Sequence, residues 1–139
     1  NIPNGPKLIG ASAVAEHRAV AESYGLTYSV WTNPLWGDRA HLAQQAQIYA
    51  AAARAAGMLV LDVEPYHEFW GANRPTGDAT FFLDTLRHAA MDVPFVFQPD
   101  PRPARLAEMR AEEWFPYCNV YAGQHYWNAF GTSPVFEMG

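Results

Sequence analysis

Cysteine, lysine and long apolar runs are all scarce in this chain of 139 residues. Cys118 is the only cysteine, so it has no partner for an internal disulfide and does not indicate the redox compartment. No apolar run approaches the length of about 20 residues that a membrane-spanning helix needs, which argues against a membrane partner. No signal peptide is recognisable at the start of the chain.

Basic clusters and several catalytic motifs are missing as well. Lys7 is the only lysine, and the basic residues are scattered in a chain of net charge -5, which argues against a nucleic-acid partner. The histidines lack paired metal-ligand spacing, and the chain contains neither a G-x-S-x-G elbow nor a phosphate-binding glycine loop. We therefore predict neither a metal nor a cofactor.

The composition is that of a globular protein, with 50% hydrophobic and 17% charged residues. We expect one α/β domain over residues 1–139, in which strands and helices alternate. The predicted strands are Lys7–Ser12, Leu26–Thr32, Met58–Val63, Val93–Gln98 and Cys118–His125. The predicted helices are Ala13–Tyr24, Arg39–Ala56, Asp78–Met91, with Asp78 as N-cap, and Ala104–Glu113. Helical crossovers join parallel strands, so the sheet should be mainly parallel, with four or five βα units.

The number of predicted strands creates a size problem. A complete (β/α)8 barrel typically needs about 200–250 residues. The fold is therefore either a small open sheet or a partial TIM-like barrel, and in the second case the chain is a fragment or an incomplete barrel. Unpaired sheet edges are a liability in a free monomer, so a second chain or segment is expected to complete a partial barrel.

The most informative segment is Leu59–Pro65, an apolar run that ends in Asp62, Val63 and Glu64. Residues i and i+2 of a strand project from the same face, so the two carboxylates should lie side by side. Neighbouring carboxylates raise each other's proton affinity, and glycoside hydrolysis uses an acid beside a second carboxylate. The alternative interpretation is that these residues cap a helix or pair with an arginine.

Polar and aromatic residues follow the other predicted strands too. The carboxyl ends of parallel strands meet at one edge of a sheet, where such folds place their sites. Aromatic faces stack on sugar rings while amides bond the hydroxyls, although large aromatics also fill small cores. The candidate sugar-binding residues are Trp31, Asn33, Tyr66, Trp70, Gln98, Gln124, Tyr126 and Trp127.

Several segments together suggest a family. They are Gly25–Trp31, a helix ending at Ala56-Gly57, the run Leu59–Glu64, the strand Val93–Phe97 and the segment Tyr121–Tyr126. In this order they resemble the lysozymes of glycoside hydrolase family 25. The resemblance implies a muramidase-like site acting on a polysaccharide such as peptidoglycan. Glu64 would donate a proton to the leaving glycosidic oxygen, and Asp62 would be the supporting carboxylate.

Two other functions remain open at this point. The aspartate on the family's first strand has no match here, which favours a non-catalytic glycan-binding or structural module within a larger extracellular or virion-associated assembly. Alternatively, Asp62 and Glu64 could bind Mg²⁺ or Ca²⁺ in a small α/β protein. We rank this cation site last because no further acidic cluster converges on the pair.

Overall fold

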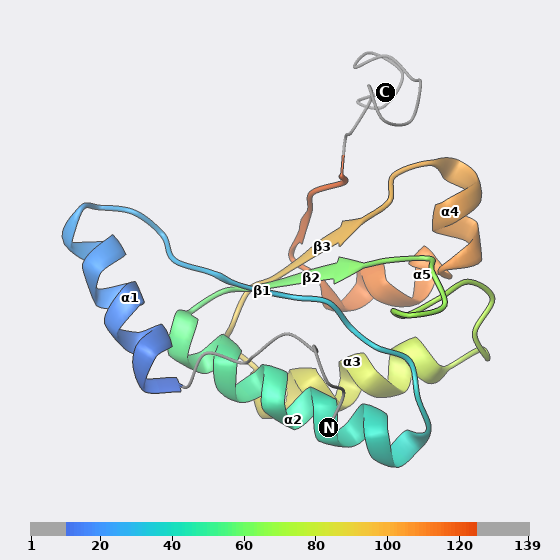
Figure 1. Cartoon of the computed structure of the whole chain (residues 1–139), viewed down its shortest axis with the longest axis horizontal. Coiled ribbons are helices and arrows are strands. Elements are labelled where there is room, and N and C mark those ends of the chain that lie inside the picture. The colour runs from blue at the N-terminus through green and yellow to red at the C-terminus, as the bar shows by residue number, and fades with distance from the viewer. Residues whose placement is uncertain (1–10, 125–139) are drawn as a thin grey trace.

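The computed structural model describes residues 11–124 of the chain. Within this range four strands form one sheet in the order β1-β2-β3-β4, and every neighbouring pair is parallel. The strands are β1 (Val30–Thr32), β2 (Leu59–Val63), β3 (Phe95–Pro99) and β4 (Val120–Tyr121). The prediction of a parallel α/β fold is confirmed (Figure 1).

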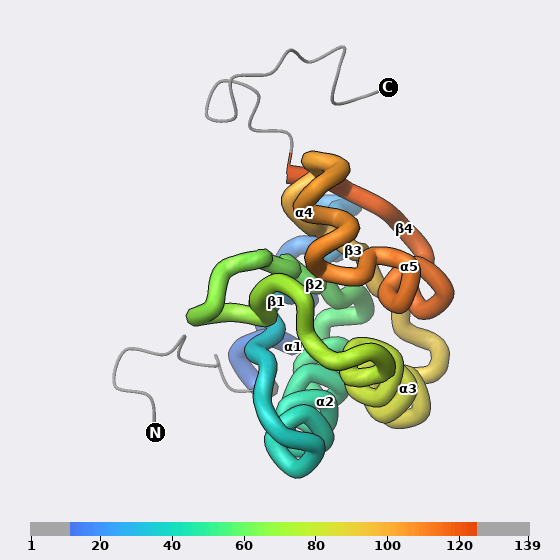
Figure 2. Tube along the Cα trace, turned by 90° about the vertical axis from the view of Figure 1, so that its right-hand side faces the viewer, coloured from blue at the N-terminus to red at the C-terminus, as the bar shows by residue number. Residues whose placement is uncertain are grey.

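The helices of the described range lie mainly on one side of this sheet. They are α1 (Ala11–Ser23), α2 (Arg39–Ala56), α3 (Asp78–Ala89), α4 (Pro103–Glu108), α5 (Ala111–Trp114) and the 3-10 helix η1 (Phe115–Tyr117). Figures 1 and 2 show α2 and α3 side by side below the sheet, with α1 against α2. No helix of residues 11–124 covers the opposite face, which is called the open face below.

The alternation along β2 explains this one-sided arrangement. Leu59, Leu61 and Val63 are fully buried in the core against the helices. Val60 and Asp62 point the other way, because successive side chains of a strand alternate between faces. The same strand therefore supplies core residues to one face and a carboxylate to the open face.

Helix α2 matches its predicted bounds because both ends carry strong signals. At its start, the Asp38 carboxylate accepts a hydrogen bond from the His41 N–H at 2.8 Å, which satisfies a donor that the helix leaves unpaired. At its end, Gly57 adopts a left-handed conformation with φ 87° and bonds the Ala53 carbonyl. Glycine adopts this conformation without the steric cost of a Cβ atom.

The predicted cap of α3 is wrong. Gly77 occupies the N-cap position with φ 88°, and Asp78 is the first helical residue. The carboxylate of Glu113 bonds the N–H groups of Gly77 at 3.1 Å and Thr80 at 3.3 Å. Asp78 instead accepts a hydrogen bond from the indole N–H of Trp36 at 2.9 Å. A carboxylate distant in sequence has thus replaced the local one as the cap.

Several predicted elements are shorter or divided. The strand expected from Leu26 begins only at Val30, and the predicted helix Ala104–Glu113 is split into α4 and α5. The split coincides with Arg110, whose backbone is left-handed with φ 53°. The predicted strand Lys7–Ser12 is wrong at its end, because Ser12 lies in α1, and residues 7–10 lie outside the described range.

Strand β4 is also shorter than predicted, although its pairing with β3 extends further. Only Val120 and Tyr121 are strand residues. Backbone hydrogen bonds nevertheless continue from Ala122 N–H to the Phe97 carbonyl at 2.9 Å, and from Gln124 N–H to the Pro99 carbonyl at 3.0 Å. This continuation holds Gln124 level with the end of β3.

Trp70 belongs to the core, which corrects its assignment as a sugar-binding residue. Its side chain is 1% exposed and packs edge-on against Trp114, with ring centroids 4.9 Å apart. Phe82 and Phe97 extend the same aromatic cluster through their contacts with Trp114. The loop after β2 therefore contributes a core residue beside the helices.

Truncation of Trp70 should distinguish this core role from a surface role. We expect Trp70→Ala to lower the free energy of unfolding by about 3–5 kcal/mol, because a large buried ring leaves a cavity. The matched control is Trp31→Ala, since Trp31 is 57% exposed and should cost less than about 1 kcal/mol. Urea unfolding monitored by circular dichroism measures both. Equal losses in the two variants would contradict the core assignment.

Candidate active site

Asp62 and Glu64 are joined by the side-chain amide of Gln124. The Gln124 Nε2 group donates hydrogen bonds to Asp62 Oδ1 and to Glu64 Oε1, the latter at 3.0 Å. Asp62 lies on β2 and Glu64 directly follows it, whereas Gln124 follows β4 on the far side of β3. The register of the three strands therefore brings these residues together at the carboxyl end of the sheet.

Asn33 supplies a second amide to the same carboxylate. It follows β1, and its Nδ2 group donates to Asp62 Oδ2 at 3.2 Å. Helix α2 fixes this residue, because the Tyr49 hydroxyl donates to the Asn33 carbonyl at 2.9 Å. One turn earlier, the Gln45 side chain bonds both the N–H and the carbonyl of Leu35 at 2.8 Å. The loop after β1 is thus held on the helix that follows it.

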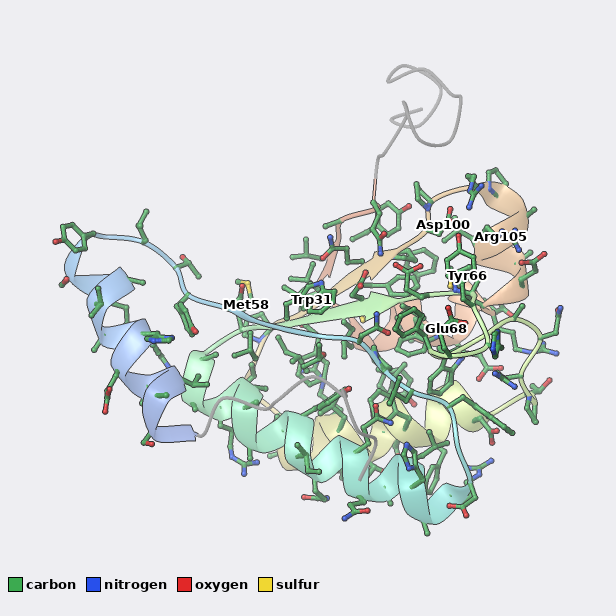
Figure 3. The ribbon with its side chains drawn as sticks, viewed as in Figure 1. Trp31, Met58, Tyr66, Glu68, Asp100 and Arg105 are labelled. Atoms are coloured by element: carbon green, nitrogen blue, oxygen red, sulfur yellow. The ribbon has the colours of Figure 1, made fainter. Side chains whose placement is uncertain are left out.

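An ion pair lies beside Glu64. Asp100 is 2% exposed, and the Arg102 guanidinium bonds its two carboxylate oxygens, with Nε–Oδ1 and Nε–Oδ2 distances of 2.9 and 3.1 Å. The hydrogen bonds that Arg102 donates to Asp100, the charge of that carboxylate and then a hydrogen bond with Tyr66 raise the pKa of Arg102, so it stays positively charged. Figure 3 shows Tyr66 and Asp100 close to each other beyond the strands.

The acidity of the carboxylate pair is weakened by its surroundings. Burial and the negative charge of Glu64 raise the pKa of Asp62 to about 7, although the bond from Gln124 acts in the opposite direction. Burial also raises the pKa of Glu64, with the Gln124 bond opposing it and Asp100 and Arg102 acting with opposite signs. Interacting groups titrate as a pair. The pair therefore retains one proton toward neutral pH.

Most of the candidate residues in the described range gather around this pair. Asn33 and Gln124 contact Asp62 directly, and the backbone carbonyl of Gln98 lies 3.4 Å from Gln124 Nε2. Gln98 pairs with Asp62 in the sheet, and Trp31 pairs with Val60, so both side chains lie on the open face. Tyr66 is 44% exposed in the loop after β2. Tyr126 and Trp127 lie outside the described residues.

The structure adds residues that strand-end reasoning does not find. Tyr49 and Gln45 stand four residues apart on α2, so they share one helix face and both reach the loop after β1. Their signal in the sequence is weak: two polar side chains on an otherwise alanine-rich buried face. Tyr49 holds the carbonyl of Asn33, and Gln45 holds the backbone of Leu35 two residues further along the loop.

Within residues 11–124, no three His, Cys, Asp or Glu side chains are grouped as metal ligands. Asp100, a further carboxylate just after β3, forms an ion pair with Arg102. The arrangement therefore gives the cation hypothesis no support. Its chemistry is that of two carboxyl groups with shared amide donors and a nearby arginine.

Comparison with protein-family models, curated proteins and solved structures finds no match for this chain. The resemblance to family 25 lysozymes consequently rests on the sequence motifs alone. Among the described residues, no helix has both the length and the hydropathy needed to cross a membrane.

The raised pKa of Asp62 predicts a pH-dependent stability. The folded protein binds this proton more tightly than the unfolded chain, so the contribution to stability is lost as pH rises from about 4 to about 7. In Asp62→Asn, the decline of the unfolding free energy across this window should be shallower than in the parent. Urea unfolding at stepped pH measures both slopes. Identical slopes would show that Asp62 titrates normally.

Proposed function

We propose that this chain is a glycoside hydrolase-like domain that acts on a polysaccharide such as peptidoglycan. The observation that carries the proposal is the shared Gln124 amide, which holds Asp62 and Glu64 side by side at a strand end. In a carboxyl pair that retains one proton, the protonated group can act as general acid and the ionised group can stabilise the positive charge of the transition state. The family resemblance of the surrounding segments supports the same class of reaction.

Glu64 is the proposed acid and Asp62 the supporting carboxylate. Glu64 is partly exposed, whereas Asp62 is 4% exposed and bonded through both oxygens, so Glu64 is better placed to reach a glycosidic oxygen. Their nearest oxygens share one donor atom, which limits their separation to two hydrogen-bond lengths, about 6 Å. Retaining glycosidases hold their carboxyl groups about 5–5.5 Å apart, so this spacing favours retention.

The proposed sugar contacts lie on the open face and at its carboxyl edge. The exposed Trp31 ring offers a stacking surface, and Tyr66 lies beside the Asp100–Arg102 pair. Asn33, Gln98 and Gln124 would bond sugar hydroxyls around the carboxylates. Polar groups that fix orientation beside an aromatic surface are typical of carbohydrate sites.

Glu64→Gln tests the catalytic proposal most simply. The variant keeps the acceptor for Gln124 but cannot donate an acidic proton, so hydrolysis of peptidoglycan should fall at least about 10²-fold. The control is Glu68→Gln, which changes an exposed carboxylate in the same loop. Release of reducing ends measures turnover, and circular dichroism checks folding. Turnover by Glu64→Gln at the parent rate would remove the assignment.

A non-catalytic module is the second candidate, and the open face of the sheet favours it. The four strands follow one another in sequence order, and the helices lie on one side of the sheet, as in a segment of a (β/α) barrel. We propose that this sheet is a segment of such a barrel. Within the described residues β1 and β4 are edge strands. A second chain or segment would pair with these edges and cover Trp31 and Val120.

This partial-barrel proposal predicts self-association of the isolated chain. Unpaired edges and apolar side chains of the open face should make the sedimentation coefficient rise with protein concentration. Val120, 47% exposed on β4, is the site for a blocking change: Val120→Lys should weaken the association. The exposed helix position Gln44→Lys is the charge-matched control. A parent chain that stays monomeric across the concentration range contradicts the proposal.

A further inference from the structure

Asn33 Oδ1 is a buried acceptor without a hydrogen-bond partner, and it is the one such side-chain atom in the described part of the chain. The other end of the same amide, Nδ2, donates to Asp62 Oδ2. Buried polar groups are nearly always bonded, because an unmet acceptor loses its hydration without compensation. An unmet acceptor directly beside the carboxylate pair therefore points to a group that arrives from outside.

Rotation of the amide does not remove the problem. The Tyr49 hydroxyl holds the Asn33 backbone, so the two orientations to compare are those in which the side-chain amide exchanges its two ends at the same place. In the exchanged orientation Oδ1 faces Asp62 Oδ2, and a hydrogen bond forms only if that oxygen carries a proton. The Nδ2 group then takes the position that lacked a partner. The exchanged orientation thus requires a proton on Asp62 Oδ2, whereas the orientation in the structure favours an ionised Asp62.

We propose that Asn33 is a positioning residue that couples ligand binding to the location of the proton shared by Asp62 and Glu64. A hydroxyl or acetamido N–H of a bound glycan donates to Asn33 Oδ1 and fixes Nδ2 against Asp62. With Gln124 donating to Oδ1 and Asn33 Nδ2 to Oδ2, both oxygens of Asp62 accept hydrogen bonds, which favours the ionised form, so the proton moves from Asp62 to the carboxylate of Glu64. No proton is exchanged with solvent in this step, and the proposed acid is loaded when the sugar arrives.

The other charged and titratable groups around Asp62 and Glu64 do not take up the proton that Asp62 releases. Arg102 neutralises Asp100 beside Glu64, through contacts at the end of β3. On the helix side, burial raises the pKa of Tyr49, so its hydroxyl stays neutral. Gln124, from the end of β4, is an uncharged donor to both carboxylates.

The inference rests on the proposed glycan-binding function and is tested by carboxyl ¹³C NMR on the full chain. Asp62 and Glu64 are titrated with and without the β-1,4-linked tetramer of N-acetylglucosamine. We expect the tetramer to lower the midpoint of Asp62 and raise that of Glu64, each by about one pH unit. In Asn33→Leu, which lacks both polar atoms, the opposite movements should disappear while the tetramer still binds. Gln44→Leu on α2 is the matched control.

Each outcome decides the inference. Opposite movements in the parent and in Gln44→Leu, absent from Asn33→Leu, support it. Midpoints that stay fixed when the parent binds the tetramer overturn it, as do equal movements in the parent and Asn33→Leu. If Asn33→Leu does not fold, Asn33→Ser replaces it in the same comparison. A parent that does not bind the tetramer removes the proposed glycan function itself, and the inference falls with it.

Discussion

The amide of Gln124 is the interaction on which the candidate site depends. Its Nε2 group donates hydrogen bonds to both Asp62 and Glu64 from the segment that follows β4. The two carboxylates are therefore held together by this shared donor as well as by their spacing of two residues along the chain. Gln124 is level with them because its own N–H continues the backbone bonding to β3 at Pro99. Backbone pairing, side-chain bonding and proton affinity are thereby linked in one place.

The division of the sheet into two faces explains why a carboxylate can be buried there. Leu61 and Val63 direct their side chains into the helix-covered core, and Asp62 between them projects to the open face. On that face the neutral amides of Asn33 and Gln124 donate hydrogen bonds to Asp62. Among the described residues, no positively charged side chain bonds it directly. Amide donors only partly offset the loss of water, so burial shifts the equilibrium toward the protonated acid.

The sequence was sufficient for the parts of the site that obey simple periodicity. Spacing of two predicts the shared face of Asp62 and Glu64, and parallel strands predict that Asn33 and Gln124 meet them. Trp70 escaped prediction because an aromatic in a loop can equally reach the surface or the core. The Glu113 cap of α3 and the support of Asn33 by Tyr49 depend on tertiary contacts, which no local pattern encodes.

Infrared titration of the carboxyl groups tests the central claim, that the amide-linked pair retains a proton toward neutral pH. We expect a carbonyl band of protonated carboxylic acid that persists to about pH 7 in the parent and disappears at lower pH in Asp62→Asn. A parent in which every carboxyl band has disappeared by about pH 5 would show two ordinary, independent acids and contradict it.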